Sequence, residues 1–265
     1  MGDFLIAAHY ETENYISPKT QFLEDVEYGR ALDTLVKACA DVILTDGELG
    51  KVLILKRVVQ PLDDWWCVGG RMQAGETPAE AAARNVLREL KIDISPDRFK
   101  YLCHASLLWQ FRHQEPKGNG TADVALTFTA ELSPEERQAI SFDTAEYEAA
   151  KWVDPATIIQ DASFHTALRR SMQHIVIRKR CEDLHAAIEA AATDVDIAKL
   201  ARVAYQAKKV LIDIERRPHA KVRSYGSSEE RELLVKAAEA AQTAASLSSG
   251  PGLGAWIYRS LGIAS

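Results

Sequence analysis

The stretch GGRMQAGETPAEAAARNVLRELKI, residues 69–92, carries the signals that decide the fold. It opens with a glycine-rich segment, and Thr77 is then followed by Pro78 and Glu80. Threonine before a helix, proline at its first position and glutamate three residues after the threonine form a capping box, which is a strong helix-start signal. The stretch therefore predicts a glycine-rich turn that leads into a capped amphipathic helix.

Strand-like segments lie on both sides of this turn and helix. Before it, residues 36–46 and 51–57 are apolar runs joined by the turn-like DGELG, which predicts a β-hairpin. After it, residues 100–111 and 121–132 have the pattern of two more strands, separated by a loop rich in proline and glycine, and residues 146–153 that of a closing strand. We therefore expect a mixed α/β domain.

The chain divides into three parts by pattern. Residues 1–34 lack clear periodicity, and we expect an extension that packs on the main domain or mediates the pairing of subunits. Residues 35–160 make up the α/β domain, and residues 161–265 a helical extension. The predicted segments of that extension are helices near residues 164–180, 196–215 and 229–245, with a solvated basic connection at residues 216–223.

The composition excludes several classes of protein. With 47% hydrophobic and 26% charged residues, the chain has the composition of a soluble globular protein. Its net charge of −6 gives no general attraction to nucleic acid or anionic lipid, and no apolar run approaches the ~18 residues of a membrane span. The four cysteines lack metal-site spacing, which favours free thiols in a reducing cytosol. We therefore expect a cytoplasmic protein without a membrane or nucleic-acid partner.

The same stretch carries candidate groups for binding a phosphate compound. Glu76, Arg84 and Glu89 follow the glycine pair, and the last two belong to the predicted helix. Glycines permit close approach of the backbone to a ligand, and helix carboxylates can hold a hard cation that neutralises phosphate oxygens. The arrangement suits a bound diphosphate.

This pattern resembles the Nudix box, G-x5-E-x7-R-E-U-x-E-E-x-G-U, in which U is a bulky aliphatic residue. The matching positions are Gly70, Glu76, Arg84, Val86, Glu89 and Ile92. Three positions depart, because Asn85 and Arg88 replace glutamates and Lys91 replaces a glycine. The resemblance covers roughly residues 36–160 and implies a Nudix-like α/β/α sandwich with a mixed sheet, to which the C-terminal helical extension is added.

The two lost glutamates are metal ligands in typical Nudix pyrophosphohydrolases, so their replacement changes the expected metal site. Placing the Arg88 guanidinium within ~5 Å of a divalent cation would cost on the order of 7 kcal/mol at an effective dielectric of about 20. Arg88 is therefore expected to point away from the cation or to face phosphate. At most one cation is expected, near Glu89.

One branch of the family, the GDP-mannose mannosyl hydrolases, resembles this depleted pattern and breaks the sugar carbon–oxygen bond of its substrate. The resemblance implies a single Mg ion, with Mn as an alternative, held by the Gly69 carbonyl and the side chains of Glu89 and Glu146. The substrate-binding residues that it implies are Arg57, Arg71, Arg84, Trp109 and Gln110. Arg84 could instead orient Glu89, and Trp109 could belong to the core.

The candidate general bases lie in different segments of the chain. That branch has a histidine in a late loop, and Tyr147 falls at its position. Tyrosine, with an ordinary pKa of about 10, is a poor base at neutral pH. The role therefore falls to Glu148, Asp41 or His113, of which Asp41 matches a strand aspartate that lies near the sugar in that branch.

Three hypotheses about function are compatible with these residues. The first is a Mg-dependent Nudix-type hydrolase of a nucleoside diphosphate-linked sugar similar to GDP-mannose, in which water attacks the sugar carbon. The second is a catalytically impaired Nudix-derived protein that binds a nucleotide or serves as a scaffold. The third is a nucleoside diphosphate pyrophosphohydrolase whose metal ligands include Glu76, Glu146 or Glu148. The expected partner is a nucleotide sugar or another nucleoside diphosphate derivative, and we expect a homodimer.

Overall fold

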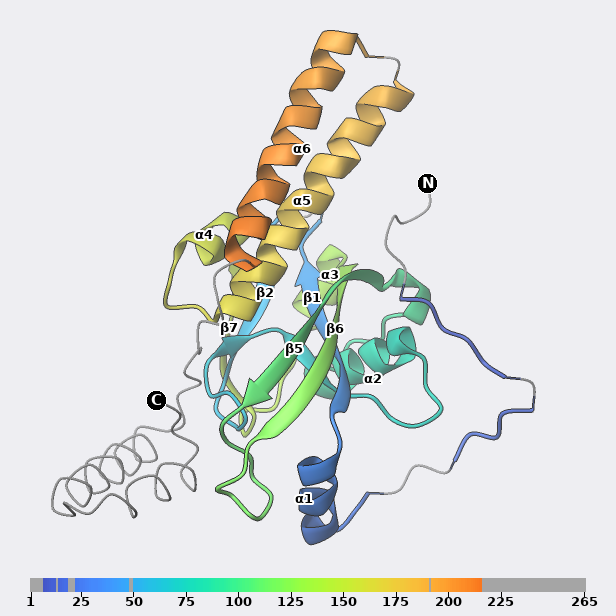
Figure 1. Cartoon of the computed structure of the whole chain (residues 1–265), viewed down its shortest axis with the longest axis vertical. Coiled ribbons are helices and arrows are strands. Elements are labelled where there is room, and N and C mark those ends of the chain that lie inside the picture. The colour runs from blue at the N-terminus through green and yellow to red at the C-terminus, as the bar shows by residue number, and fades with distance from the viewer. Residues whose placement is uncertain (1–6, 13, 19–21, 48–49, 191, 216–265) are drawn as a thin grey trace, which may run out of the picture. The chain divides into compact units, whose positions relative to one another are not determined.

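The computed structural model describes residues 7–215, except for residues 13, 19–21, 48–49 and 191 (Figure 1). The strands of the described part are β1 (Lys37–Thr45), β2 (Val52–Arg57), β3 (Trp65–Trp66), β4 (Val68–Arg71), β5 (Lys100–Trp109), β6 (Thr121–Glu131) and β7 (Tyr147–Val153). The helices are α1 (Asp25–Thr34), α2 (Pro78–Leu90), the short 3-10 helix η1 (Pro96–Arg98), α3 (Pro134–Gln138), α4 (Pro155–Gln160), α5 (Thr166–Glu189) and α6 (Asp194–Glu215). The predicted helix at 229–245 and the basic connection at 216–223 lie outside the described residues.

The strands form one mixed sheet that forks beside β1. The strand order is β3-β2-β1-β6-β5, with β4 also paired to β1 and β7 to β2. β1 and β6 run parallel, whereas the other pairs are antiparallel. On its other edge, β1 pairs with β2 where Thr45 faces Val52, which agrees with the predicted hairpin, and with β4 from Cys39 to Val42. Because the partner on this edge changes from β4 to β2 along β1, the sheet forks there.

Helix α2 begins as the sequence predicts. The Thr77 side chain accepts a hydrogen bond from the Glu80 N–H at 3.2 Å, the Glu80 carboxylate accepts one from the Thr77 N–H at 2.8 Å, and Pro78 is the first helical residue. The helix ends at Leu90 because Lys91 adopts a left-handed conformation with φ of 61°. Lys91 therefore keeps the helix-ending backbone shape at the position where the family pattern has glycine.

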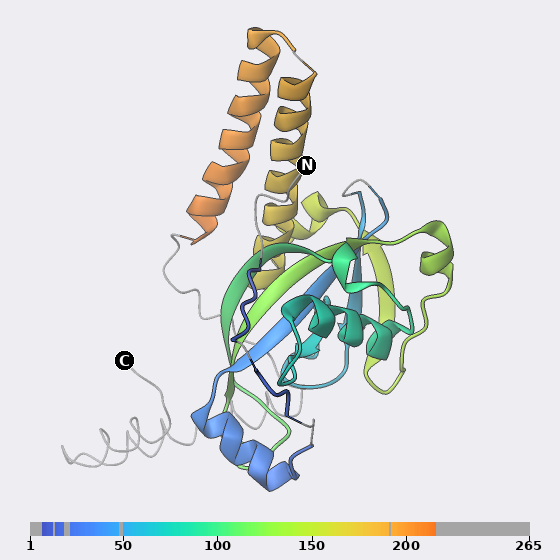
Figure 2. The same ribbon diagram turned by 90° about the vertical axis from the view of Figure 1, so that its right-hand side faces the viewer.

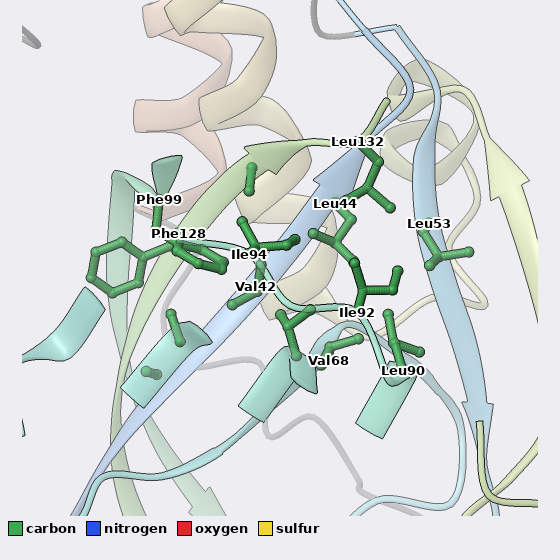
Figure 3. Close-up of a cluster of buried hydrophobic side chains, with 14 of the residues drawn as sticks. Val42, Leu44, Leu53, Val68, Leu90, Ile92, Ile94, Phe99, Phe128 and Leu132 are labelled. Carbon is green, nitrogen blue, oxygen red and sulfur yellow. The ribbon is translucent and has the colours of Figure 1, made fainter. Parts of the chain in front are cut away.

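Helices cover both faces of the sheet (Figures 1 and 2). On one face, α2 packs against Val42 and Leu44 of β1, within the cluster drawn in Figure 3. On the other face, Leu168 and Met172 of α5 pack with Ile43 of β1. Successive strand residues point to opposite faces, so β1 contributes to both layers, and each fully buried aliphatic side chain stabilises the fold by about 1.5–3 kcal/mol. The predicted α/β/α sandwich with a mixed sheet is confirmed.

Helix α1 is not predicted from the sequence, and it packs on the loop between β5 and β6. Asp33 accepts a hydrogen bond from Nη1 of the buried Arg112 at 2.7 Å. A Cβ atom on Gly29 would lie 2.0 Å from the carbonyl oxygen of Glu115, so a residue without a side chain is required for this close approach. Helix α1 of the N-terminal extension therefore packs on the α/β domain, whereas the pairing of subunits stays a prediction.

Helices α5 and α6 form an antiparallel hairpin (Figure 1). The first part of α5 buries Leu168, Met172 and Ile175 against the sheet, and Gln173 Nε2 donates to the Ala207 carbonyl of α6 at 3.0 Å. The core of the α/β domain thus continues past the predicted boundary at residue 160. Neither these two helices nor any other helix in the described residues is long and apolar enough to cross a membrane.

Candidate active site

A cleft of about 310 Å³ opens beside the fork of the sheet. Its positively charged lining residues are Lys37, Arg57, Arg71, Arg84 and Arg88. Its acidic lining residues are Asp41, Asp123 and Glu146, and its aromatic ones are Phe22, Tyr28, Trp66 and Trp109. The lining carries more cations than acids, which suits an anionic ligand with an attached ring or apolar group.

Asp41 is a buried acid of β1 that lines the cleft. It pairs in register with Gly69 of β4, and a Cβ atom on Gly69 would lie 2.3 Å from its Oδ1, so glycine is required opposite it. Burial raises the pKa of Asp41 to about 7, with Asp123 and Glu89 adding to the rise and Arg57 opposing it. A carboxyl group with this pKa can accept or release a proton near neutral pH.

Glu89 of α2 lies next to the same glycine but inside the protein, with a fully buried side chain. Its carboxylate accepts hydrogen bonds from the Gly69 N–H at 3.2 Å and from the Tyr147 hydroxyl, and it is paired with the Arg88 guanidinium. Burial raises the pKa of Glu89, opposed by the Tyr147 hydrogen bond and by Arg88. Burial also raises the pKa of Tyr147, so its hydroxyl keeps its proton and serves as a donor.

Arg84 of α2 forms an ion pair with Glu76, which lies in the segment before the helix. Arg84 Nε and Nη2 donate to the two carboxylate oxygens of Glu76 at 2.8 and 2.6 Å. Arg84 Nη2 also donates to the Arg71 carbonyl at 2.9 Å, which ties α2 to β4. This bidentate pair directs Arg84 towards Glu76 and leaves it fewer donors for a diphosphate.

Asn85 links α2 to two strands of the sheet. Its Nδ2 donates to the carbonyls of Ala40 on β1 and Gly70 on β4, at 3.2 and 3.1 Å, and its Oδ1 accepts from Arg84 Nη1 at 3.0 Å. The side chain is buried, so these bonds satisfy both ends of the amide. The residue that replaces a family glutamate is therefore a structural connection.

The Arg88 guanidinium folds back over the paired glycines. Its Nη2 pairs with the Glu89 carboxylate and donates to the Gly69 carbonyl at 3.4 Å. The same nitrogen would lie 3.1 Å from a Cβ atom on Gly70. Arg88 was expected to point away from a bound cation or to face phosphate, and in this structure it contacts the two groups expected to hold that cation, because the buried Glu89 needs a positive partner.

These contacts do not fit a resident metal ion. A divalent cation such as Mg needs oxygen ligands that are free to bind it. The expected ligands Gly69 and Glu89 both contact Arg88, while Glu146, the third, lines the cleft. Within residues 7–215 as described, no group of three or more His, Cys, Asp or Glu side chains has an arrangement suited to a metal. The expectation of Mg or Mn therefore has no matching ligand set in this part of the chain.

Aromatic side chains form a second part of the lining, partly from the N-terminal extension. The Tyr28 ring of α1 lies 5.0 Å from the guanidinium carbon of Arg71, in a cation–π contact. Trp66 and Trp109 meet edge to face with ring centroids 5.9 Å apart, and the Trp109 indole donates to Asp123 at 2.8 Å. Phe22, Tyr28, Lys37 and Asp123 were not among the predicted site residues, because no local motif marks them.

The structure brings together most of the predicted site residues. Those that line the cleft are Asp41, Arg57, Gly69, Arg71, Arg84, Trp109 and Glu146. Glu89 lies buried against Gly69. The remaining three, Gln110, His113 and Glu148, are exposed and are not part of the lining. Of the three candidate bases, Asp41 is thus the one placed in the cleft.

Comparisons with known proteins add the following findings. The NUDIX domain family matches residues 36–175. The dihydroneopterin triphosphate diphosphatase of Escherichia coli K12 is 29% identical over 161 residues, covering 58% of this chain and 98% of that protein. A structure of the E. coli dihydroneopterin triphosphate pyrophosphohydrolase aligns at 23% identity with a TM-score of 0.38, over 55% of this chain and 99% of that one. A MutT NUDIX hydrolase from Burkholderia pseudomallei aligns at 19% identity with a TM-score of 0.40, over 53% and 98%.

Proposed function

Because this chain belongs to the Nudix family and is a Nudix-type hydrolase, we propose that it hydrolyses a nucleoside diphosphate derivative bound in the cleft. The placement of a buried acid, Asp41, on the same lining as Arg57 and Arg71 supports this reaction. The three side chains supply what such a hydrolysis needs: a proton acceptor for water and cations for a diphosphate.

Arg57 and Arg71 hold the diphosphate. Within the described part of the chain neither of them forms an ion pair, and the buried Nε of Arg57 has no hydrogen-bond partner there. Arg71 is held by the Tyr28 ring, which leaves its donors available. Guanidinium groups present pairs of N–H donors that match two phosphate oxygens, so two of them stabilise a departing diphosphate.

Asp41 acts as the general base. Its pKa of about 7 leaves a large fraction ionised at neutral pH, and its position on the lining gives it access to a water molecule. Asp41 takes a proton from that water while the water oxygen bonds to the substrate. The bond to the diphosphate oxygen breaks, its electron pair stays on the diphosphate, and Asp41 later releases the proton to solvent.

The first choice of substrate is a nucleotide sugar similar to GDP-mannose, attacked at the sugar carbon. Attack at phosphorus brings an oxygen nucleophile towards an anionic centre, and enzymes commonly assist that step with a metal-bound water. Attack at the sugar carbon needs a base and a stabilised leaving group, which Asp41 and the arginines provide. The aromatic residues beside the arginines give the nucleoside base a surface on which to stack.

A second candidate is cleavage of a phosphoanhydride bond. The similarity to dihydroneopterin triphosphate diphosphatase extends over 98% of that protein and favours this alternative. Tyr147 favours it too, because the tyrosine at the histidine position of the mannosyl hydrolases is buried and bonded to Glu89. The base on which the carbon route of that branch depends is thus absent at position 147.

Hydrolysis in ¹⁸O-labelled water separates the two routes. The full-length protein is incubated with GDP-mannose and, separately, with dihydroneopterin triphosphate, with and without added Mg. The position of the label is then determined from the product masses by mass spectrometry. Label in free mannose supports the carbon route, whereas label in GMP or mannose 1-phosphate, or in the pyrophosphate or monophosphate released from dihydroneopterin triphosphate, supports anhydride cleavage. If neither these compounds nor a panel of nucleotide sugars and dinucleotides is hydrolysed, the proposed function is rejected.

A further inference from the structure

We propose that the Arg88 guanidinium takes the place of the divalent cation in this Nudix site, so that the chain binds a diphosphate without a metal cofactor. The proposal rests on the proposed function only in placing a diphosphate in the cleft. It rests otherwise on the contacts of Arg88, Glu89 and Asn85.

The position of the guanidinium is the first step. Arg88 contacts both the Gly69 carbonyl and the Glu89 carboxylate, the two groups expected to hold the metal. Glu89 is fully buried, and a buried carboxylate needs a positive partner close by. Arg88 supplies that charge from within the chain, and the carbonyl of the glycine turn is oriented towards the same group.

The exclusion of a metal ion follows from the same position. A divalent cation bound to Gly69 and Glu89 would lie within about 5 Å of the guanidinium unless Arg88 moved away. At an effective dielectric of about 20, that repulsion weakens binding on the order of 10⁵-fold. Arg88 and a metal ion are therefore alternative partners of Glu89.

The remaining donors of Arg88 are available to a ligand in the cleft. Its side chain is 53% exposed and lines the cleft. Only Nη2 makes hydrogen bonds within the described residues, so Nε and Nη1 keep their N–H groups for another acceptor. Phosphate oxygens in the cleft meet this requirement, and Arg57 and Arg71 line the same space.

Asn85 completes the change in the chemistry of the box. A metal ligand must offer a lone pair, whereas the Asn85 amide turns its NH₂ group to the carbonyls of Ala40 and Gly70 and its oxygen to Arg84. Both family glutamates that this chain lacks are thus replaced by side chains that donate hydrogen bonds. The two replacements are consistent with each other, because each removes a negatively charged carboxylate from a site that no longer holds a cation.

Manganese binding to the full-length protein tests the exclusion of metal. Mn²⁺ is titrated while the signal of free Mn²⁺ is followed by electron paramagnetic resonance. Wild type is expected to bind Mn²⁺ no tighter than about 1 mM, and Arg88→Gln at least tenfold tighter because Glu89 loses its positive partner. Arg88→Lys keeps the charge and should still exclude Mn²⁺. Arg98→Gln removes the guanidinium of the Arg98–Glu136 pair outside the cleft and should not gain binding.

Calorimetric titration with inorganic pyrophosphate in EDTA tests the second part of the proposal, that the chain binds a diphosphate without a metal. Wild type should bind pyrophosphate without metal, and Arg88→Gln should bind it at least tenfold more weakly, whereas Arg98→Gln should bind it as wild type does. The wild-type measurements stand even if Arg88→Gln does not fold. A wild-type protein that binds one Mn²⁺ more tightly than about 1 mM and loses it in Glu89→Gln overturns the proposal.

Failure of this proposal and failure of the proposed function give different results. A protein that hydrolyses nucleoside diphosphate derivatives only when Mg is bound keeps the proposed function and overturns the role of Arg88. A protein that binds pyrophosphate in EDTA and excludes Mn²⁺, but turns over no compound of the panel, supports the role of Arg88 and rejects the proposed function.

Discussion

Asp41 and Glu89 are two buried acids beside the same residue, Gly69, and their surroundings differ. Glu89 receives hydrogen bonds from the Gly69 N–H and the Tyr147 hydroxyl and is paired with Arg88. Asp41 lies on the lining of the cleft, where a ligand or water can reach it. Burial raises the pKa of both groups. Both residues are buried acids, so their different roles follow from their surroundings. Glu89 is fixed by its partners and supports the structure, whereas Asp41 can exchange a proton with a ligand or water.

The largest expected effect is the loss of activity in Asp41→Asn. The amide cannot accept the proton of the attacking water, and removing a general base lowers kcat by about 10²–10⁴-fold. Steady-state kinetics on the substrate found in the labelling experiment measure the loss. Asp97→Asn, which changes an exposed acid outside the cleft, should leave kcat unchanged. A fall of less than about threefold in Asp41→Asn would remove Asp41 from the reaction and with it the contrast to Glu89.

The pH dependence is expected to follow Asp41. The base must be ionised, so kcat/KM should be highest above pH 7 and should fall about tenfold per pH unit below that value. Because the Glu89 charge contributes to the raised pKa of Asp41, Glu89→Gln should move the midpoint to lower pH. Glu136→Gln, which changes the Arg98 pair, should not move it. A midpoint that stays near 7 in Asp41→Asn would identify another group as the base.

Ionisation of Asp41 should raise activity as the pH rises, but it should lower the stability of the folded protein. The folded state holds the Asp41 proton more tightly than the unfolded chain, whose aspartate pKa is about 4. Ionising Asp41 therefore costs stability progressively between about pH 4 and pH 7 and by a constant amount above. Asp41→Asn removes this cost, so its Tm should exceed that of wild type at pH 8 and approach it at pH 4. The same variant thus loses activity and gains stability.

The elements that the sequence predicts depend on neighbouring residues. Thr77, Pro78 and Glu80 start α2 because a capping box is satisfied within four residues. Apolar runs with turn residues between them likewise predict β1 and β2, because hairpin formation is local. The helix α1 was missed: its N-cap, Glu24, makes no side-chain cap hydrogen bond, and its packing depends on Arg112, which is distant in sequence.

The sequence predicts those residues of the candidate site that belong to a motif. It does not predict the residues that only tertiary packing brings to the cleft. Arg71 and Glu89 belong to the glycine-rich stretch, so their proximity follows from the predicted turn and helix. The orientation of Arg88 depends on how deeply Glu89 is buried, and the spacing of the two residues carries no information about that. Tyr28 reaches the cleft because α1 packs beside it, which no pattern in residues 1–34 indicates.

Tyr147→Phe tests the structural role of Glu89, which is one side of its contrast with Asp41. The variant removes one of three partners of a buried carboxylate, so the free energy of unfolding should fall by about 1–3 kcal/mol. Urea unfolding of the full-length protein measures it, and Tyr101→Phe, whose hydroxyl bonds the exposed His104, should cost less than about 0.5 kcal/mol. Equal losses in the two variants would contradict a structural role for the Glu89 hydrogen bonds.

Tyr28→Leu should show the smallest effect, and on binding instead of stability. The Tyr28 ring holds the Arg71 guanidinium by a cation–π contact of about 0.5–1 kcal/mol, so its loss should weaken pyrophosphate binding in EDTA about two- to fivefold. Tyr10→Leu, which changes an exposed tyrosine of the N-terminal extension, serves as the control and should bind as wild type does. Substitution of Tyr28, on the cleft side of Gly69, should then change affinity. Substitution of Tyr147, on the buried side, should change the free energy of unfolding. If Tyr28→Leu destabilises the protein as much as Tyr147→Phe and leaves affinity unchanged, α1 supports the fold and contributes nothing to the diphosphate site.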